Sequence, residues 1–374
     1  MPVFANIYRL GIKELWSLAR DPVMLVLIVY CFTVSIYVAA TAVPDSLDKV
    51  PIAIVDEDAS PLSARIAAAF YRPRFNPPAN LSLSEMDAGM DAGAYSFVLD
   101  IPPDFQRDVL ARRSPAIQLN VDATRMSQAF VGSAYIQEIA LGEVSDFVQR
   151  HRSGIPPMVD LNLRARYNPN LQQAWFGALS EIINNVTMLA IILTGAALIR
   201  EREHGTIEHL LVMPVTPAEI MLAKVWAMGL VVLIAAAIGL LVVVQGVLRV
   251  PVAGSVALFL AGTALHLFAA TALGIFMATL ARSMPQFGML AVLILLPLQM
   301  LSGTFSPRES MPEFVQFVML GAPTTHFVEL GQAILFRGAG LGVVWPEFLA
   351  LLVIGVVLFG FSLARFRKTI SELA

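Results

Sequence analysis

The chain has 374 residues, of which 57% are hydrophobic and only 14% are charged, and its formal net charge is −3. Soluble domains carry roughly 25% charged residues, so this chain lacks the polar surface that a soluble protein of its length needs. The small negative charge argues against a nucleic-acid-binding surface. A single cysteine, Cys31, excludes an intramolecular disulfide and a thiolate metal cluster.

Residues 1–20 are predicted to form an amphipathic helix on the inner membrane surface. One face carries apolar residues: Phe4, Ile7, Tyr8, Gly11, Ile12, Leu15 and Trp16. Charged Arg9, Lys13 and Glu14 lie elsewhere. The same pattern also fits an ordinary helical lead-in to the next segment.

Six uncharged stretches are long enough to cross a bilayer, which takes a helix of about 20 residues. Counted between consecutive Asp, Glu, Lys or Arg residues, they hold 23, 18, 24, 32, 25 and 17 residues, whereas the longest run within 43–166 holds 12. They predict spans at residues 22–42, 180–199, 225–247, 255–280, 285–303 and 348–364. The predicted fold class is therefore an α-helical polytopic membrane protein with six transmembrane helices.

The small residues at 39–42 raise the alternative that the first run is a cleaved signal peptide. The apolar core of a signal peptide usually has 7–15 residues, and here about 20 residues of amphipathic sequence precede a longer run. We therefore predict that the first span is retained.

Residues 43–175 are predicted to form an α/β domain inserted between the first and second spans. Short β-rich runs at 52–55, 96–99 and 117–121 alternate with helical patterns at 63–70 and 105–110. A further helical pattern over 126–149 leads towards the second span. The domain shows no catalytic arrangement. A turn after a strand explains the acidic cluster of Asp56, Glu57 and Asp58 better than a metal site does, so no metal is predicted.

Lysine and arginine residues near span ends indicate the side of each loop. With a cytoplasmic N-terminus, the inner segments hold ten of them, and the two short outer loops hold three: Arg249, Arg308 and Arg337. The sequence therefore predicts cytoplasmic termini, including the tail 365–374, and a periplasmic inserted domain. The external domain without disulfides favours a bacterial inner membrane.

The inner segment 200–224 is much longer than a simple link between two helices requires. Near its end, Thr216 and Pro217 followed by Glu219 predict the start of the next helix. Its beginning contains Glu201, Glu203, Gly205, Thr206, Glu208, Leu210 and Leu211. These residues match the pattern Glu-x-Glu-x-Gly-Thr-x-Glu-x-Leu-Leu followed by a proline-containing turn, and the segment therefore resembles the membrane subunits of type-2 ABC exporters. The order of the other segments is similar to that of this family as well.

The resemblance implies a permease subunit of an ATP-driven exporter for hydrophobic or amphiphilic compounds, with drug efflux as the expected branch. In that family two permease copies or homologues pair, and each contacts a cytosolic ATPase through this loop. The periplasmic domain is expected to meet a membrane-fusion adaptor. ATP and Mg²⁺ belong on the partner ATPase, and this chain is expected to be non-catalytic and to bind no cofactor.

The lysines support a separate ATPase independently of the resemblance. A P-loop requires a lysine directly after glycine to hold the nucleotide phosphates. The four lysines of the chain are Lys13, Lys49, Lys224 and Lys368, and none follows a glycine. This polypeptide therefore cannot bind ATP in that way.

Residues 304–346 are interrupted by prolines and glycines and are too broken to span. We expect two short amphipathic helices at 313–320 and 325–336. They would either re-enter the outer leaflet beside a translocation path or form an outer loop.

Polar residues inside spans are costly and often functional. The candidates are Glu181, Asn184, Asn185, Gln245, His266 and Gln299. The first three share a helix face and are hypothesised to line the translocation path or the subunit interface. The alternative for each residue is hydrogen bonding between helices.

Two other functions fit the sequence less well. An ion-coupled secondary transporter usually carries buried carboxylates at mid-span, and the span interiors here contain no Asp or Glu. A membrane-anchored ligand receptor or scaffold needs neither six spans nor such a long inner segment.

Overall fold

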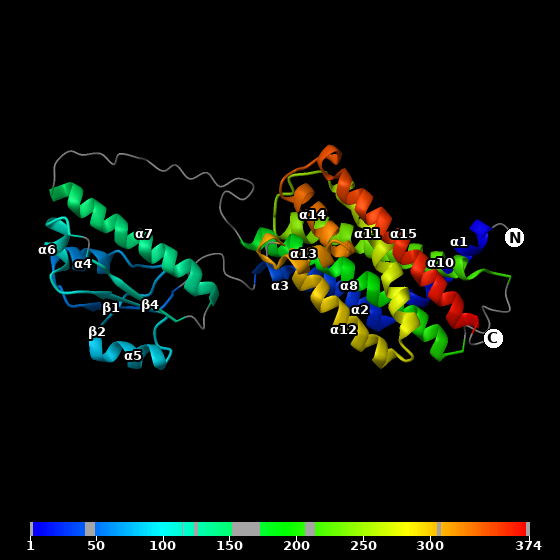
Figure 1. Ribbon diagram of the computed structural model, residues 1–374, viewed down its shortest axis with the longest axis horizontal. Coiled ribbons are helices and arrows are strands. Elements are labelled where there is room, and N and C mark those ends of the chain that lie inside the picture. Colours follow the sequence, from blue (N-terminus) through cyan, green and yellow to red (C-terminus); the bar gives the residue numbers. More distant parts are fainter. Residues whose placement is uncertain are drawn as a thin grey trace. The chain divides into compact units, whose positions relative to one another are not determined.

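A computed structural model describes residues 3–41, 49–113, 115–122, 126–151, 173–205, 214–304 and 308–371. The chain divides into two compact units (Figure 1). One unit combines Met1–Val43 with Ala165–Ala374 and is helical. The other, Pro44–Arg164, contains a β-sheet.

The described residues contain six helices long and apolar enough to cross a membrane. The first consists of α2 (Pro22–Tyr30), the π-helical η1 (Cys31–Ser35) and α3 (Ile36–Thr41). The second is α8 (Gln173–Glu203), and the third is α10 (Pro217–Ile238) continued by the π-helical η2 (Gly239–Val247). The remaining three are α11 (Val256–Leu280), α12 (Met284–Leu301) and α15 (Leu341–Ser371).

Helix α8 lies at the centre of the helical unit. In the most apolar 18-residue stretch of α8, 89% is buried within the protein. The corresponding share is 17% in α12 and in α15. Glycines allow close approach: a Cβ on Gly274 of α11 would lie 2.7 Å from the carbonyl oxygen of Ile191 in α8. The exposed α12 and α15 present large apolar side chains outward, as helices facing lipid or another subunit do.

Local capping explains where several helices begin. Asp21 accepts a hydrogen bond from the N–H of Met24 and caps α2. Thr216 and Glu219 form a capping box, so α10 begins at Pro217, eight residues before the predicted 225. The helix start that the sequence indicates at Thr216 and Pro217, within the segment 200–224, is thus confirmed. Helix α15 also extends beyond the predicted 348–364 at both ends.

Helix α1 (Val3–Ala19) lies at the same end of the helical unit as the end of α8 (Figure 1). Aromatic Phe4, Tyr8 and Trp16 are exposed, as expected of a helix at the headgroup level. Glu14, in contrast, is buried against the unit. The amphipathic pattern alone did not indicate this inward charge.

Residues 308–335 form the 3₁₀-helix η3 (Arg308–Ser310), α13 (Glu313–Met319) and α14 (Pro323–Leu335). Helix α14 is buried along most of its length, and it packs against α8, α11 and α15. Helix α13 instead exposes Phe314 and Phe317. Both helices lie at the opposite end of the unit from α1 (Figure 1).

The second unit has a four-stranded sheet in the order β2–β1–β3–β4. Its strands are β1 (Ile52–Asp56), β2 (Ala79–Leu81), β3 (Phe97–Ile101) and β4 (Gln118–Val121), and only the β3–β4 pair is antiparallel. The helices are α4 (Pro61–Ala68), α5 (Leu83–Asp91), α6 (Phe105–Leu110) and α7 (Met126–His151). Helices α4, α6 and α7 cover one face and α5 covers the other. The short β2 was not predicted, because Ala-Asn-Leu carries no β-rich signal.

Candidate functional site

The end of α8 carries four consecutive charged residues, Arg200–Glu203, and each contacts another part of the helical unit. Helix α8 ends here because Gly205 adopts a positive φ of +67°, which glycine reaches without steric cost. A Cβ at this position would meet nothing within 4 Å. Backbone conformation rather than space therefore favours glycine at 205.

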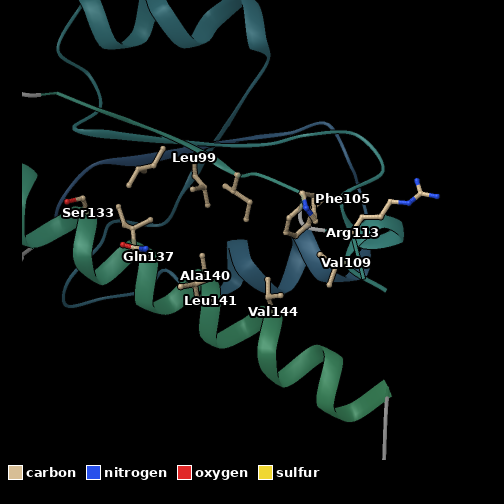
Figure 2. A pocket seen from close by; sticks show the side chains of 13 residues that line it. Leu99, Phe105, Val109, Arg113, Ser133, Gln137, Ala140, Leu141 and Val144 are labelled. Carbon is tan, nitrogen blue, oxygen red and sulfur yellow. The ribbon is translucent and has the colours of Figure 1, made fainter. Parts of the chain in front are cut away.

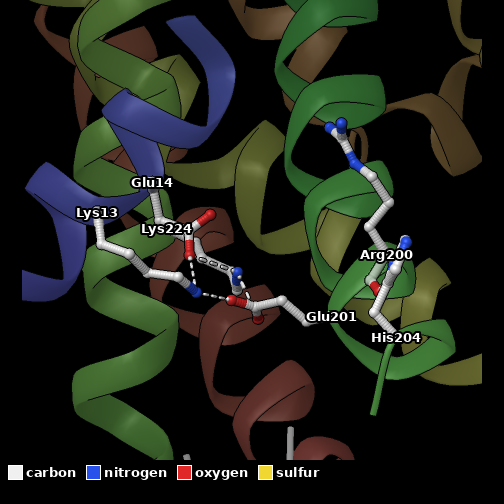
Figure 3. Close-up of polar contacts among 6 residues, drawn as sticks. All are labelled: Lys13, Glu14, Arg200, Glu201, His204 and Lys224. Carbon is white, nitrogen blue, oxygen red and sulfur yellow. Dashed lines mark hydrogen bonds and ion pairs between the residues drawn. The ribbon is translucent and has the colours of Figure 1, made fainter. Parts of the chain in front are cut away.

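Glu201 belongs to a cluster of four charges that come from three helices (Figure 3). The Lys224 Nζ of α10 lies 2.7 Å from Glu201 Oε2 and 3.0 Å from Glu14 Oε1 of α1. Lys13 Nζ pairs with Glu201 Oε1 and lies 3.4 Å from Glu14 Oε1. Lys224 is 1% exposed, and Glu14 and Glu201 are also buried. A buried charge is costly unless it is paired, and these two positive and two negative groups neutralise each other.

The carboxylates also determine the protonation of Lys13. Burial disfavours its ammonium group, but the adjacent Glu201 and Glu14 outweigh burial and raise the pKa of Lys13. Lys13 therefore stays positively charged at neutral pH, and α1 remains electrostatically attached to the end of α8.

Arg200 points away from this cluster (Figure 3) and pairs with Asp21, the residue that caps the first span. Burial would raise the pKa of Asp21, but the Met24 N–H and the Arg200 guanidinium outweigh it and hold that pKa below its usual value. The end of α8 is thereby joined to the start of the first span.

The next two residues hold the turn between the fourth and fifth spans. Arg202 donates hydrogen bonds to the carbonyl oxygens of Ala278, at 3.5 Å, and Ala281 at the end of α11. Glu203 Oε1 accepts a 2.8 Å hydrogen bond from the N–H of Met284 at the start of α12. These contacts satisfy backbone groups that helix ends leave unpaired.

Helix α1 is attached to α10 by further contacts. Asn6 Nδ2 donates to Glu219 Oε1 at 3.1 Å, and the Trp226 indole donates to the carbonyl oxygen of Ile7 at 3.2 Å. The rings of Tyr8 and Trp226 are stacked, with centroids 6.1 Å apart. The surface helix and the third span are thus joined along several turns.

The charged residues at the end of α8 and their charged partners on α1, α10 and the first span are called the helix junction below. It comprises Lys13, Glu14, Asp21, Arg200–Glu203 and Lys224. Of the predicted loop residues, Glu201, Glu203 and Gly205 lie in it or next to it. Thr206, Glu208, Leu210 and Leu211 lie outside the described residues. Sequence reasoning missed the roles of Lys13, Glu14, Asp21 and Lys224, because their partners are distant in the chain. The local sequence gave one signal for such roles, namely that Glu14 and Lys224 stand next to apolar residues.

The predicted polar face of the second span meets the first span. Asn185 Nδ2 donates to the carbonyl oxygen of Cys31 at 2.8 Å, within the π-helical η1, and to Glu181 Oε1 at 3.3 Å. Ser35 donates to the same Glu181 oxygen. Asn184 is buried. The bonds to Cys31 and Ser35 join α8 to the first span within one chain, whereas the bond from Asn185 to Glu181 lies within α8.

The other three polar candidates lie apart from that face. His266 of α11 is fully buried, with its Nε2 2.8 Å from Thr187 Oγ1 and its ring stacked on Phe327 of α14. Gln245 in η2 and Gln299 in α12 are half-buried. Within the described residues, no group of three or more His, Cys, Asp or Glu side chains is arranged to hold a metal ion.

In the described part of the chain, six helices are long and apolar enough to span a membrane, and α8 lies buried at their centre. Ion pairs and hydrogen bonds from the charged end of α8 join several of them. These features define a polytopic membrane protein. A family model described as ABC-2 family transporter protein matches residues 22–364. The chain therefore belongs to the ABC-2 transporter family.

Two curated relatives from Escherichia coli (strain K12) show how close the similarity is. The chain is 62% identical over 369 residues to the inner membrane transport permease YhhJ, covering 99% of both chains. It is 28% identical over 372 residues to the probable multidrug ABC transporter permease YbhR, covering 98% of this chain and all of that relative.

Proposed function

We propose that this chain is the permease subunit of an ATP-driven exporter in the bacterial inner membrane, with both termini in the cytoplasm. A cytosolic ATPase binds ATP and Mg²⁺ and acts on the segment 200–224. Family membership and the name of the relative YhhJ support the permease role and the inner membrane. The lysine pattern supports a separate ATPase, because this chain has no P-loop lysine.

The observation that carries the coupling proposal is the helix junction. Residues 206–213 connect the end of α8 to the start of α10 in the chain. A force that the ATPase exerts on this segment would therefore act on both helices. Arg200 and Glu201 pass displacement of α8 to the first span and to α1. Arg202 and Glu203 pass it to the fourth and fifth spans. One contact with an ATPase would therefore move most of the bundle together.

We propose hydrophobic or amphiphilic drugs as the exported compounds. The names of the relatives YbhR and, at 24% identity over 359 residues, YbhS call both probable multidrug ABC transporter permeases and support drugs as the cargo. We propose that the polar face of Glu181, Asn184 and Asn185 borders the export path or the subunit interface. Gln245, His266 and Gln299 are further candidates for the path. Intact export at normal protein levels after alanine substitution of Asn184 and Asn185 would contradict this assignment.

Two further partners complete the proposed assembly. A second permease copy or homologue pairs with this chain, and the exposed apolar surface of α12, including Met289 and Leu293, offers it a contact area. The inserted domain lies in the periplasm and meets a membrane-fusion adaptor.

Co-purification tests the coupling. The tagged chain is purified from its native membranes, and the bound ATPase is identified by mass spectrometry and by ATP hydrolysis. Glu203→Gln, Gly205→Ala and Glu208→Gln should lose the ATPase, whereas the matched control Glu313→Gln, at the start of α13, should retain it. Equal ATPase binding by all four variants would refute the coupling role of this segment.

A further inference from the structure

The unit Pro44–Arg164 contains a cavity of about 510 Å³ between its sheet and helix α7 (Figure 2). Its walls are mainly apolar. They include Leu99 and Leu119 from the sheet, Phe105 from α6, and Ile136, Ala140 and Val144 from α7. Protein interiors are close-packed, so an apolar space of this size next to a hydrophobic core calls for a physical cause.

Helix α7 is also held against the rest of the unit by contacts outside the cavity. Near its start, Gly132 packs so closely on the ring of Phe97 that a Cβ would lie 2.2 Å from it. Further along, Arg65 of α4 makes hydrogen bonds of 2.6 and 3.0 Å to Glu143. Between these points, the small Ala140 leaves the cavity unfilled. The cavity is therefore part of the folded unit.

The polar groups of the cavity lie at its two ends. Ser133 and Gln137, one helical turn apart on α7, are at one end, and Arg113 is at the other (Figure 2). Arg113 is exposed and pairs with Asp108 at 3.2 Å. An exposed ion pair of this kind is weak, so an incoming anion can replace Asp108 as the partner of Arg113.

The charges around this end favour an anion over a cation. The segment 104–113 contains three arginines, at 107, 112 and 113, and two aspartates, at 104 and 108. Its net charge is therefore +1. The volume also limits the occupant. It lies within the range of small-molecule pockets, about 300–1,000 Å³. Two turns of a partner's helix, with a diameter near 10 Å and a pitch of 5.4 Å, would need about 800 Å³. The cavity is smaller than this, so its volume fits a small molecule better than a helix.

We propose that this cavity binds a long-chain anionic amphiphile, such as a fatty carboxylate. The hydrocarbon chain lies between Leu119, Phe105 and Ala140, and the acid group pairs with Arg113 at the mouth. Gln137 can donate a hydrogen bond to a further polar group at the other end. The proposal concerns binding by this unit alone and does not depend on coupling to an ATPase.

The test uses the full chain in lipid nanodiscs and a diazirine-bearing palmitic acid as the probe. After irradiation, labelled peptides are identified by mass spectrometry. We expect label on α7 between 133 and 144 and on β4. Ala140→Phe, which fills the cavity, and Leu141→Trp, which narrows its mouth, should remove this label. The matched control Leu83→Trp, on the exposed surface of α5, should retain it.

A second comparison tests the role of charge. The same probe with an alcohol in place of the acid should label the cavity about tenfold less, as expected from the loss of a charged hydrogen bond. Arg113→Gln should reduce acid labelling to the level of the alcohol. The proposal is overturned if cavity labelling is absent or persists in both Ala140→Phe and Leu141→Trp. It is also overturned if acid and alcohol label equally.

Discussion

Lys224 is the most deeply buried charged residue of the helix junction, so its charge depends most on the carboxylates that pair with it. The residue is 1% exposed, and its ammonium group lies within 3.0 Å of two carboxylates, those of Glu14 and Glu201. Replacement by methionine keeps an unbranched side chain of similar length and removes the charge. Lys13 then remains as the one cation of the cluster for two buried carboxylates, and the cluster carries one net negative charge.

The expected loss of unfolding free energy for Lys224→Met is about 3–5 kcal/mol, the usual cost of removing one partner of a buried ion pair. Lys13→Met should cost about 1 kcal/mol or less, because the Lys13 side chain is 48% exposed and water screens its charge. The two lysines contact the same carboxylates, so this difference isolates the effect of burial.

A double variant separates charge from packing. Glu201→Gln combined with Lys224→Met leaves Lys13 and Glu14, which again form a neutral pair. We therefore expect the double variant to regain at least half of the stability that Lys224→Met loses. If only packing mattered, the second substitution would bring no recovery.

Unfolding free energies can be measured by SDS titration in mixed micelles, with tryptophan fluorescence as the signal. Trp226 contacts α1 directly and reports on the separation of α1 from α10. The electrostatic account fails if Lys224→Met is within 1 kcal/mol of the wild type. It fails equally if the double variant is no more stable than Lys224→Met.

Three further predictions use the same assay. Asp21→Asn keeps a helix cap but loses the charge that pairs with Arg200. Because the pKa of Asp21 is lowered in the folded state, the pair stabilises above the unfolded pKa of about 3.9 and is lost as the pH falls through the lower folded value. The advantage of the wild type over this variant should therefore be present at pH 6 and shrink below about pH 4; an advantage independent of pH would contradict this. Gly274→Ala should cost about 1–3 kcal/mol by overpacking against α8, whereas Gly288→Ala, which meets no atom within 4 Å, should be neutral or stabilising; equal effects would argue against close packing at Gly274. Asn185→Ala should cost about 1 kcal/mol because it removes a hydrogen bond to the first span, and an unchanged free energy would show that this bond contributes nothing.

The six spans were recoverable from sequence because hydrocarbon tolerates only helices with internally satisfied backbone and few charges. That requirement leaves long uncharged runs that can be counted. Span ends were less accessible, since they depend on capping. Charge counting placed the start of the third span at 225, whereas Thr216, Pro217 and Glu219 indicated the helix start that α10 has at Pro217. Likewise, the spacing of Glu181 and Asn185 showed that they share a face, but their partners Ser35 and Cys31 became clear only from packing.

The sequence by itself determined the class of this protein, through its long apolar runs and the motif from Glu201 to Leu211. Only the tertiary structure decided what Glu201 contacts. Lys13, Glu14 and Lys224 lie on separate helices, and no local pattern brings them together. Pairing of buried charges depends on distances of about 3 Å, which arise once α1, α8 and α10 pack. The same holds for the cavity beside α7, whose space depends on how Gly132 and Arg65 hold that helix.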